Sequence, residues 1–126
     1  MTEFVKRQYR LLPWIDTDKL DMYVVSMEPK AISFLEKHPE KIDWNSIWIN
    51  TPAIHIILEN IDKKEVNWSL FAGNEADEVY PFIRDNFDKI TDFSYFCRNR
   101  NPWINKIFEE FPHYIDRLNR KEMGCN

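Results

Sequence analysis

The chain has 126 residues, a formal net charge of −4 at pH 7, and 44% hydrophobic, 15% aromatic and 30% charged residues. This composition is typical of a globular protein rather than a disordered one, and the acidic balance argues against generic binding to nucleic acid or anionic membranes. With only Gly73 and Gly124, glycine-rich phosphate-binding loops are excluded. No apolar run is long enough for a transmembrane helix, and the first residues lack the apolar stretch of a signal peptide.

Residues 1–18 form an N-terminal segment that precedes the repeats. It carries the apolar run Leu-Leu-Pro-Trp-Ile at residues 11–15. Each repeat of a helical array buries its apolar face only against its neighbours, so an array needs a cap at each end. We therefore expect this run to cover the apolar end of the first repeat.

Four short blocks of the sequence resemble one another. Each block is eight residues long, opens with Asp or Asn, continues with a large apolar residue, and closes on Glu or Asn. The blocks open at Asp21, Asp43, Asn67 and Asp92, and the large apolar residues are Met22, Trp44, Trp68 and Phe93. Their spacings of 22, 24 and 25 residues are typical of a solenoid whose loops vary slightly in length.

Each block predicts a short first helix. The second block places Trp44, Ile47 and Trp48 at positions i, i+3 and i+4, which is one face of a helix, and the other blocks follow this spacing. The opening Asp or Asn is a good N-cap, because its side-chain oxygen accepts free backbone N–H groups. We expect five aromatic residues to pack in the core. Four lie on these faces, Trp44, Trp68, Phe93 and Phe96, and the fifth, Trp103, lies on the second helix of the fourth repeat.

A second helix is predicted after each block. Proline suits the first helical turn, and Pro29, Pro52 and Pro102 recur there, with Glu75 in the third repeat. Thr51 and Asn101 precede two of these prolines as expected caps. The apolar faces are Ala31/Ile32/Leu35, Ala53/Ile54/Ile57/Leu58, Ala76/Val79/Tyr80/Ile83 and Trp103/Ile104/Ile107/Phe108. Pro39 and Pro112 are expected to end two of the helices.

The predicted fold class is all-α: a right-handed helical-repeat solenoid of about four helix-turn-helix units of 22–25 residues. No Gly- or Ser-rich linker interrupts the chain, so we expect a single helical-repeat domain over residues 1–126. Residues 1–18 form the N-terminal cap, residues 19–114 the repeats, and residues 115–126 a C-terminal cap or tail.

Two stretches resemble a known kind of repeat. Residues 29–44 (PKAISFLEKHPEKIDW) and 51–60 (TPAIHIILEN) are similar to short repeats in proteins of large nucleocytoplasmic DNA viruses, which read roughly N-P-x-A-I-x-L-L-E-x-N-x-x-K-I-D-W and are loosely called ankyrin-like. The resemblance is good over residues 13–64 and weak over 65–114, where Glu75 replaces proline and Trp103 replaces alanine. The T-P-L-H signature of true ankyrin repeats is absent. The resemblance implies a helical repeat and a viral source, and it carries no catalytic residues.

The residues that could carry chemistry form no recognisable site in the sequence. His38, His55 and His113 lack the close spacing of zinc ligands. The acidic residues at 75, 77 and 78 suit the first turn of a helix. The two cysteines are too far apart for a disulfide framework, so we expect Cys97 to be a small core residue, Cys125 a free thiol in the tail, and the compartment to be reducing. We expect no enzyme activity, no cofactor and no metal.

Five other aromatic and basic residues are candidates for contact with a partner. They are Trp48, Tyr95, Arg98, Arg100 and Tyr114. We expect a non-enzymatic protein–protein interaction module, either a viral accessory protein or a host-interaction adaptor. The alternative is a structural minor protein of the virion or capsid. A small hydrolase or a nucleic-acid-binding module would need a deep polar pocket that this pattern does not predict.

The expected partner is another protein, either a host factor or a viral structural protein, with no nucleic acid and no membrane. The expected location is the host cytoplasm or the virion, without secretion. The sequence leaves the oligomeric state, the partner and the binding face open.

Overall fold

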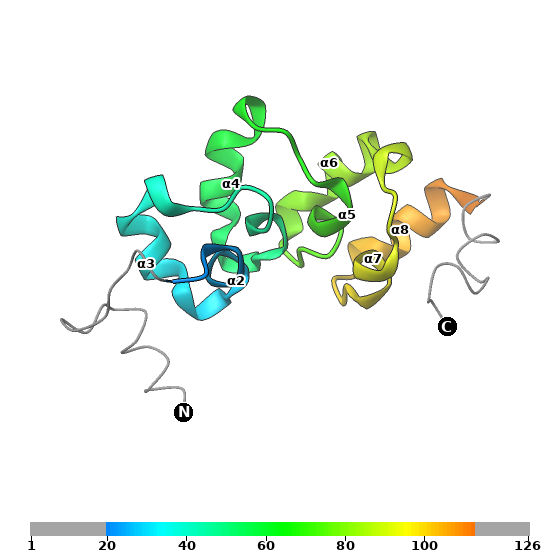
Figure 1. Cartoon of the computed structure of the whole chain (residues 1–126). Helices are drawn as coiled ribbons and strands as arrows, with labels where there is room; N and C mark the ends of the chain where they lie inside the picture. Colours follow the sequence, from blue (N-terminus) through cyan, green and yellow to red (C-terminus); the bar gives the residue numbers. More distant parts are fainter. Residues whose placement is uncertain (1–19, 113–126) are drawn as a thin grey trace. The chain divides into compact units, whose positions relative to one another are not determined.

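The computed structural model describes residues 20–112, and every regular element within that range is a helix (Figure 1). The all-α prediction is therefore confirmed for this part of the chain. The chain divides into two compact units, which we name the N-terminal half (residues 1–65) and the C-terminal half (residues 66–126). The expected caps at 1–18 and 115–126, with the apolar run 11–15, lie outside the described residues.

The N-terminal half contains the first two predicted helix pairs. Its elements are α2 (Met22–Met27), η2 (Pro29–Ala31), α3 (Ile32–Lys37), η3 (Pro39–Lys41), η4 (Ile47–Ile49), η5 (Thr51–Ala53), α4 (Ile54–Asn60) and η6 (Ile61–Lys63), where η denotes a 3₁₀ helix. The first elements of its two pairs, α2 and η4, pack against each other. The second helices begin side by side, because η2 contacts η5.

The C-terminal half contains the third and fourth pairs. Its elements are α5 (Trp68–Phe71), η7 (Asp77–Val79), α6 (Tyr80–Asp85), η8 (Phe87–Lys89), α7 (Ser94–Arg98) and α8 (Trp103–Glu110). Here α5 packs against α7 and α6 against α8. Within each half, first elements therefore pack on first elements and second helices on second helices.

One predicted helix takes another form. The first element of the second block is a turn followed by η4, not an α-helix. The Oγ of Ser46 donates to Tyr23 O at 2.7 Å, and Oδ1 of Asp43 accepts the N–H of Asn45 at 2.9 Å. The bond of Asp43 is local and competes with α-helical bonding, whereas the bond of Ser46 reaches the preceding block; together they explain the difference.

All four predicted capping residues accept backbone hydrogen bonds. Asp21 caps α2 by accepting the N–H groups of Tyr23 and Val24, and Asn67 caps α5 by accepting that of Leu70. The carboxylates of Asp43 and Asp92 accept the N–H groups two residues ahead. The N-cap prediction is thus confirmed for Asp21 and Asn67. It is wrong for Asp43 and Asp92, because η4 and α7 begin later and have Ser46 and Phe93 at their N-cap positions.

Second helices begin at or near the predicted prolines. Pro29 and Pro52 lie in the first turns of η2 and η5, and Pro102 immediately precedes α8. The Oδ1 of Asn101 accepts the N–H of Trp103, as expected of a cap. Pro39 opens the short helix η3 after α3, and comparable 3₁₀ turns, η6 and η8, follow α4 and α6. These three turns were not predicted from the sequence.

In each half, an asparagine at the end of the second block ties the second helix pair to the first. In the N-terminal half, Nδ2 of Asn50 donates to the carbonyls of Ser26 and Glu28 at 2.9 and 3.1 Å. These two carbonyls belong to the sixth and eighth positions of the first block. An asparagine that spans two blocks in this way fixes their relative register.

The C-terminal half repeats this arrangement at the same block positions. Nδ2 of Asn99 donates to the carbonyls of Ala72 and Asn74, both at 2.9 Å. Both asparagines are buried, and the four accepting carbonyls occupy the same two positions of the preceding block. We call these two sets of bonds the asparagine bridges.

A buried serine supports each asparagine bridge. The Oγ of Ser26 accepts the N–H of Asp43 at 2.9 Å, and the Oγ of Ser69 accepts that of Asp92 at 3.0 Å. The bonded N–H opens the second block of its half in both cases. The two serines occupy block positions three residues apart, which lie one helical turn apart on the same face. Different sequence positions thus supply the same bond.

The core follows the predicted faces, except that Trp48 rather than Trp44 is the buried tryptophan of the second block. Trp48 is fully buried, whereas Trp44 and Trp68, predicted to be in the core, are only half-buried. The ring of Trp44 lies under Nζ of Lys64 at 5.1 Å. In a 3₁₀ turn three residues complete one turn, so Trp44 and Trp48 do not share a face as they would in an α-helix.

Candidate functional site

Trp48 does not contribute to the surface, contrary to the prediction that it anchors a partner. Its side chain has 0% relative exposure, and its Nε1–H donates to Trp44 O at 2.7 Å. The indole packs edge-on against the Trp44 ring, with the ring centroids 5.6 Å apart. Burial with a satisfied indole N–H is typical of a core tryptophan.

The other predicted contact residues lie in or after α7. Tyr95 is half-buried, and Arg98 and Arg100 are exposed on either side of the buried Asn99. The asparagine bridge therefore anchors the backbone between two exposed guanidinium groups. Tyr114 lies outside the described residues, as does His113.

Two exposed apolar residues on α2 were not predicted as contact residues. Tyr23 is 45% exposed and Val24 is 55% exposed, and they are the only large hydrophobic side chains reported as exposed within residues 20–112. Both lie off the helical face formed by Met22 and Val25. Two adjacent apolar residues outside the predicted apolar face were the signal that could have identified them.

A pocket of about 270 Å³ lies between α3 and α4 of the N-terminal half. Leu35, Ile42 and Ile56, all mostly buried, supply its apolar floor. Its rim is polar and is formed by Glu36, His55 and Glu59. We call it the α3–α4 pocket.

One contact crosses the rim of the α3–α4 pocket. The Nε2 of His55 lies 2.9 Å from Oε2 of Glu36, and both side chains are about half exposed. Glu59 lies one helical turn after His55 and makes no hydrogen bond or ion pair with any residue that the structure describes. At the rim, the carboxylate of Glu36 therefore contacts His55, and the carboxylate of Glu59 is open to a ligand.

A second pocket, of about 300 Å³, lies in the C-terminal half and is lined by residues of η7, α6 and α8 and of the loop before α8. Its wall includes the rings of Tyr80 and Trp103, whose centroids are 6.2 Å apart. Asp77 and Lys106 give the lining both signs of charge. The Oδ1 of Asp77 accepts a bond from Asn101 Nδ2 at 2.7 Å, so this carboxylate is already occupied.

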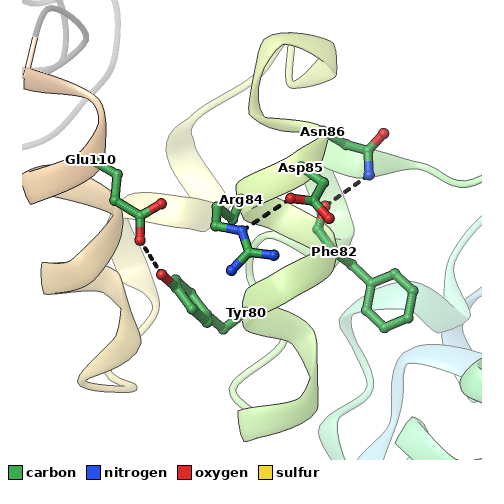
Figure 2. A network of polar contacts seen from close by, with 6 residues as sticks. All are labelled: Tyr80, Phe82, Arg84, Asp85, Asn86 and Glu110. Atoms are coloured by element: carbon green, nitrogen blue, oxygen red, sulfur yellow. Dashed lines mark hydrogen bonds and ion pairs between the residues drawn. The ribbon is translucent and has the colours of Figure 1, made fainter.

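A polar network on α6 and α8 borders this second pocket (Figure 2). The Tyr80 hydroxyl of α6 donates to the Glu110 carboxylate of α8, and the side chains point toward each other. This hydrogen bond raises the pKa of Tyr80 above its ordinary value of 10.0. Nearby, Arg84 Nε lies 3.0 Å from Oδ1 of Asp85, and this contact raises the pKa of Arg84. The hydrogen bond between Tyr80 and Glu110 ties α6 to α8.

Asp92 is the one described carboxylate with a clear pKa shift. Its Oδ1 accepts the Oγ–H of Ser94 at 2.7 Å and the backbone N–H of Ser94 at 3.0 Å. These bonds lower the pKa of Asp92, and the charge of Arg98 contributes in the same direction. The shift is explained by these two hydrogen bonds to Ser94, the first residue of α7.

The remaining candidates for chemistry have local structural roles. His38 packs on Phe34, with ring centroids 4.7 Å apart, and its Nδ1 lies 3.6 Å from Glu40. Cys97 is half-buried and disulfide-bonded, so the prediction of a small apolar core residue was wrong; Cys125, predicted to be a thiol in the tail, lies outside the described residues. Within residues 20–112, no group of three or more His, Cys, Asp or Glu side chains could hold a metal ion. The helices of that same range are all too short or too polar to cross a membrane.

Comparison with known proteins gives no relative. No protein-family model matches the chain, and neither the curated proteins nor the solved structures contain a match. The resemblance to viral helical repeats therefore rests on the motifs at residues 29–44 and 51–60. Arguments about function rest on the chain's own geometry.

Proposed function

We propose that this chain is a non-enzymatic protein–protein interaction module, built as a right-handed helical-repeat solenoid of four helix pairs. Solenoids present extended surfaces made of residues at repeated positions, and such surfaces serve binding more readily than catalysis. The observation that carries the proposal is the recurrence of the asparagine bridge, at Asn50 and at Asn99. It supports a repeat in which the two pairs of each half are held in one register.

Two surfaces support a binding role. In the C-terminal half, Arg98 and Arg100 are exposed from a backbone that Asn99 anchors, so their position is fixed before any partner arrives. In the N-terminal half, Tyr23 and Val24 are exposed on a capped helix. Rigid presentation lowers the entropic cost of association, and aromatic and arginine side chains are common anchors in protein interfaces.

We further propose that the protein is a viral accessory protein or host-interaction adaptor. The support is the resemblance of residues 29–44 and 51–60 to viral repeats. The second candidate is a minor structural protein of the virion, since a small helical repeat with exposed apolar residues can fill a space between larger subunits. Its partner would then be a capsid protein.

Cross-linking and mass spectrometry in the native source test these proposals, with purified particles examined in parallel. One variant carries Tyr23→Ser and Val24→Ser, a second carries Arg98→Ser and Arg100→Ser, and Lys37→Ser on α3 is the control. We expect one host protein to be recovered at fixed stoichiometry and to be lost with one of the two surface variants but not with the control. Recovery with capsid proteins in particles would support the structural role instead. An unchanged partner set for all variants would contradict binding through either surface.

A further inference from the structure

We propose that the α3–α4 pocket binds an arginine side chain of a partner protein. This inference rests on the proposed interaction function and names one of its contacts. The pocket combines an apolar floor with acidic groups at the rim, and no Lys or Arg is among the described residues that line it. An arginine side chain has the matching parts, an apolar stem and a charged planar head.

The floor fits the stem of such a side chain. Leu35, Ile42 and Ile56 are at most 9% exposed and come from three parts of the N-terminal half, so the surface they form is fixed by the core. The volume of about 270 Å³ lies below the roughly 300–1,000 Å³ that is typical of sites for small organic ligands. A single long side chain therefore fits this space better than a cofactor does.

The rim fits the guanidinium head. Glu59 has no polar partner among the described residues, so its carboxylate is available to a cation. His55 holds Glu36 from the neighbouring helix at 2.9 Å, which keeps a second carboxylate at the same opening. A guanidinium group has five N–H donors in a fixed plane and can bond both carboxylates at once.

The second pocket provides an internal comparison. Its lining includes Lys106, and its carboxylate at Asp77 already accepts a bond from Asn101. Two cations lie over the Tyr80 ring in the same wall. Lys106 Nζ is 5.4 Å and Arg84 Cζ is 5.6 Å from the ring centroid. A cationic side chain is repelled by these groups, so we expect arginine at the α3–α4 pocket only.

Titration of the full chain with two short peptides, followed by NMR, tests this inference. One peptide is acetyl-Ala-Ala-Arg-Ala-Ala-amide, and the other has citrulline, a neutral analogue of nearly the same shape, in place of arginine. We expect the arginine peptide to shift the signals of Leu35, Ile42 and Ile56 with millimolar affinity, and not those of Trp103. The citrulline peptide should bind clearly more weakly.

Single variants assign the contact to the rim. Glu59→Gln should weaken binding of the arginine peptide roughly twofold to fivefold, as expected for an exposed ion pair. Glu78→Gln, which removes the same charge from the exposed surface of the C-terminal half, should leave it unchanged. Equal binding of the two peptides, no binding, or equal affinity for Glu59→Gln and wild type would overturn the inference. The proposed function would still stand if the wild-type chain recovers the cross-linked partner and one of the surface variants does not. The two failures are therefore distinguishable.

Discussion

The two halves of the chain share their polar bonds and differ in their apolar cores. Each half has an asparagine bridge and a serine that accepts the first N–H of the following block. The core of the N-terminal half is mainly aliphatic around Phe34 and Trp48. In the C-terminal half, Phe87 alone contacts three other phenylalanine rings, those of Phe93, Phe96 and Phe111.

This difference indicates which feature defines the repeat. Apolar cores tolerate exchange of side chains when the volume is kept, whereas a buried polar group needs its partner in a fixed direction. The asparagine bridges therefore stay in place while the packing around them changes.

The largest expected effect concerns the two tryptophans of the second block. Trp48→Ala removes a fully buried side chain and should lower the free energy of unfolding by about 3–5 kcal/mol. Trp44→Ala should cost clearly less, because that ring is only half-buried. Chemical denaturation followed by circular dichroism measures both. A larger loss for Trp44→Ala would mean that the register of η4 is wrong.

The next prediction compares the asparagine bridges. Asn50→Ala and Asn99→Ala each remove two hydrogen bonds and leave buried carbonyls without those donors, so each should cost about 2–4 kcal/mol. The control is Asn105→Ala on the exposed surface of α8, which should change stability by less than about 0.5 kcal/mol. Thermal and urea unfolding give these values. Losses as small as that of the control would show that the bridges do not hold the repeat.

The N-caps should contribute smaller and similar amounts in the two halves. Asp21→Ala and Asn67→Ala each remove a side chain that accepts backbone N–H groups at a helix start, and each should cost about 1 kcal/mol. The same urea titration measures both. Replacement by Ser, which also caps helices, should restore most of the stability, and failure of Ser to do so would point to a role other than capping.

The smallest effect concerns pH. The lowered pKa of Asp92 means that the folded state favours its ionised form, so its contribution to stability is present above the ordinary pKa of 3.8 and is lost as the pH falls through the lower folded value. Asp92→Asn should remove this part of the acid dependence. Comparison of melting temperatures between about pH 2 and pH 5 would reveal it. Parallel pH curves for the variant and the wild type would contradict the assignment.

Much of the fold could be predicted because local signals carry it. Apolar spacing, capping residues and prolines at helix starts are short-range features, and they correctly located the helix pairs. The exchange of Trp44 and Trp48 could not be predicted, since it depends on a 3₁₀ turn that forms where Ser46 bonds Tyr23 from the preceding block. Such long-range bonds leave no periodic pattern in the sequence.

The candidate site was less predictable than the fold. Glu36, His55 and Glu59 look in the sequence like ordinary residues of solvated helix faces, and only the packing of α3 and α4 brings them to one opening. Tyr23 and Val24 lie outside the predicted apolar face of the first helix, so the sequence carried a signal for their exposure, which was not predicted. Arg98 and Arg100 were identified as a basic pair, but the anchoring of Asn99 between them became evident only from its bonds across blocks.

The most direct test of the repeat is the exchange of side-chain amide protons, measured by NMR on the wild-type chain. If the asparagine bridges define the repeat, the side-chain NH₂ groups of Asn50 and Asn99 should both exchange slowly with solvent, because both are buried and bonded to two carbonyls. The exposed Asn45 and Asn105 should exchange rapidly in the same sample. Rapid exchange at either Asn50 or Asn99 would contradict the account.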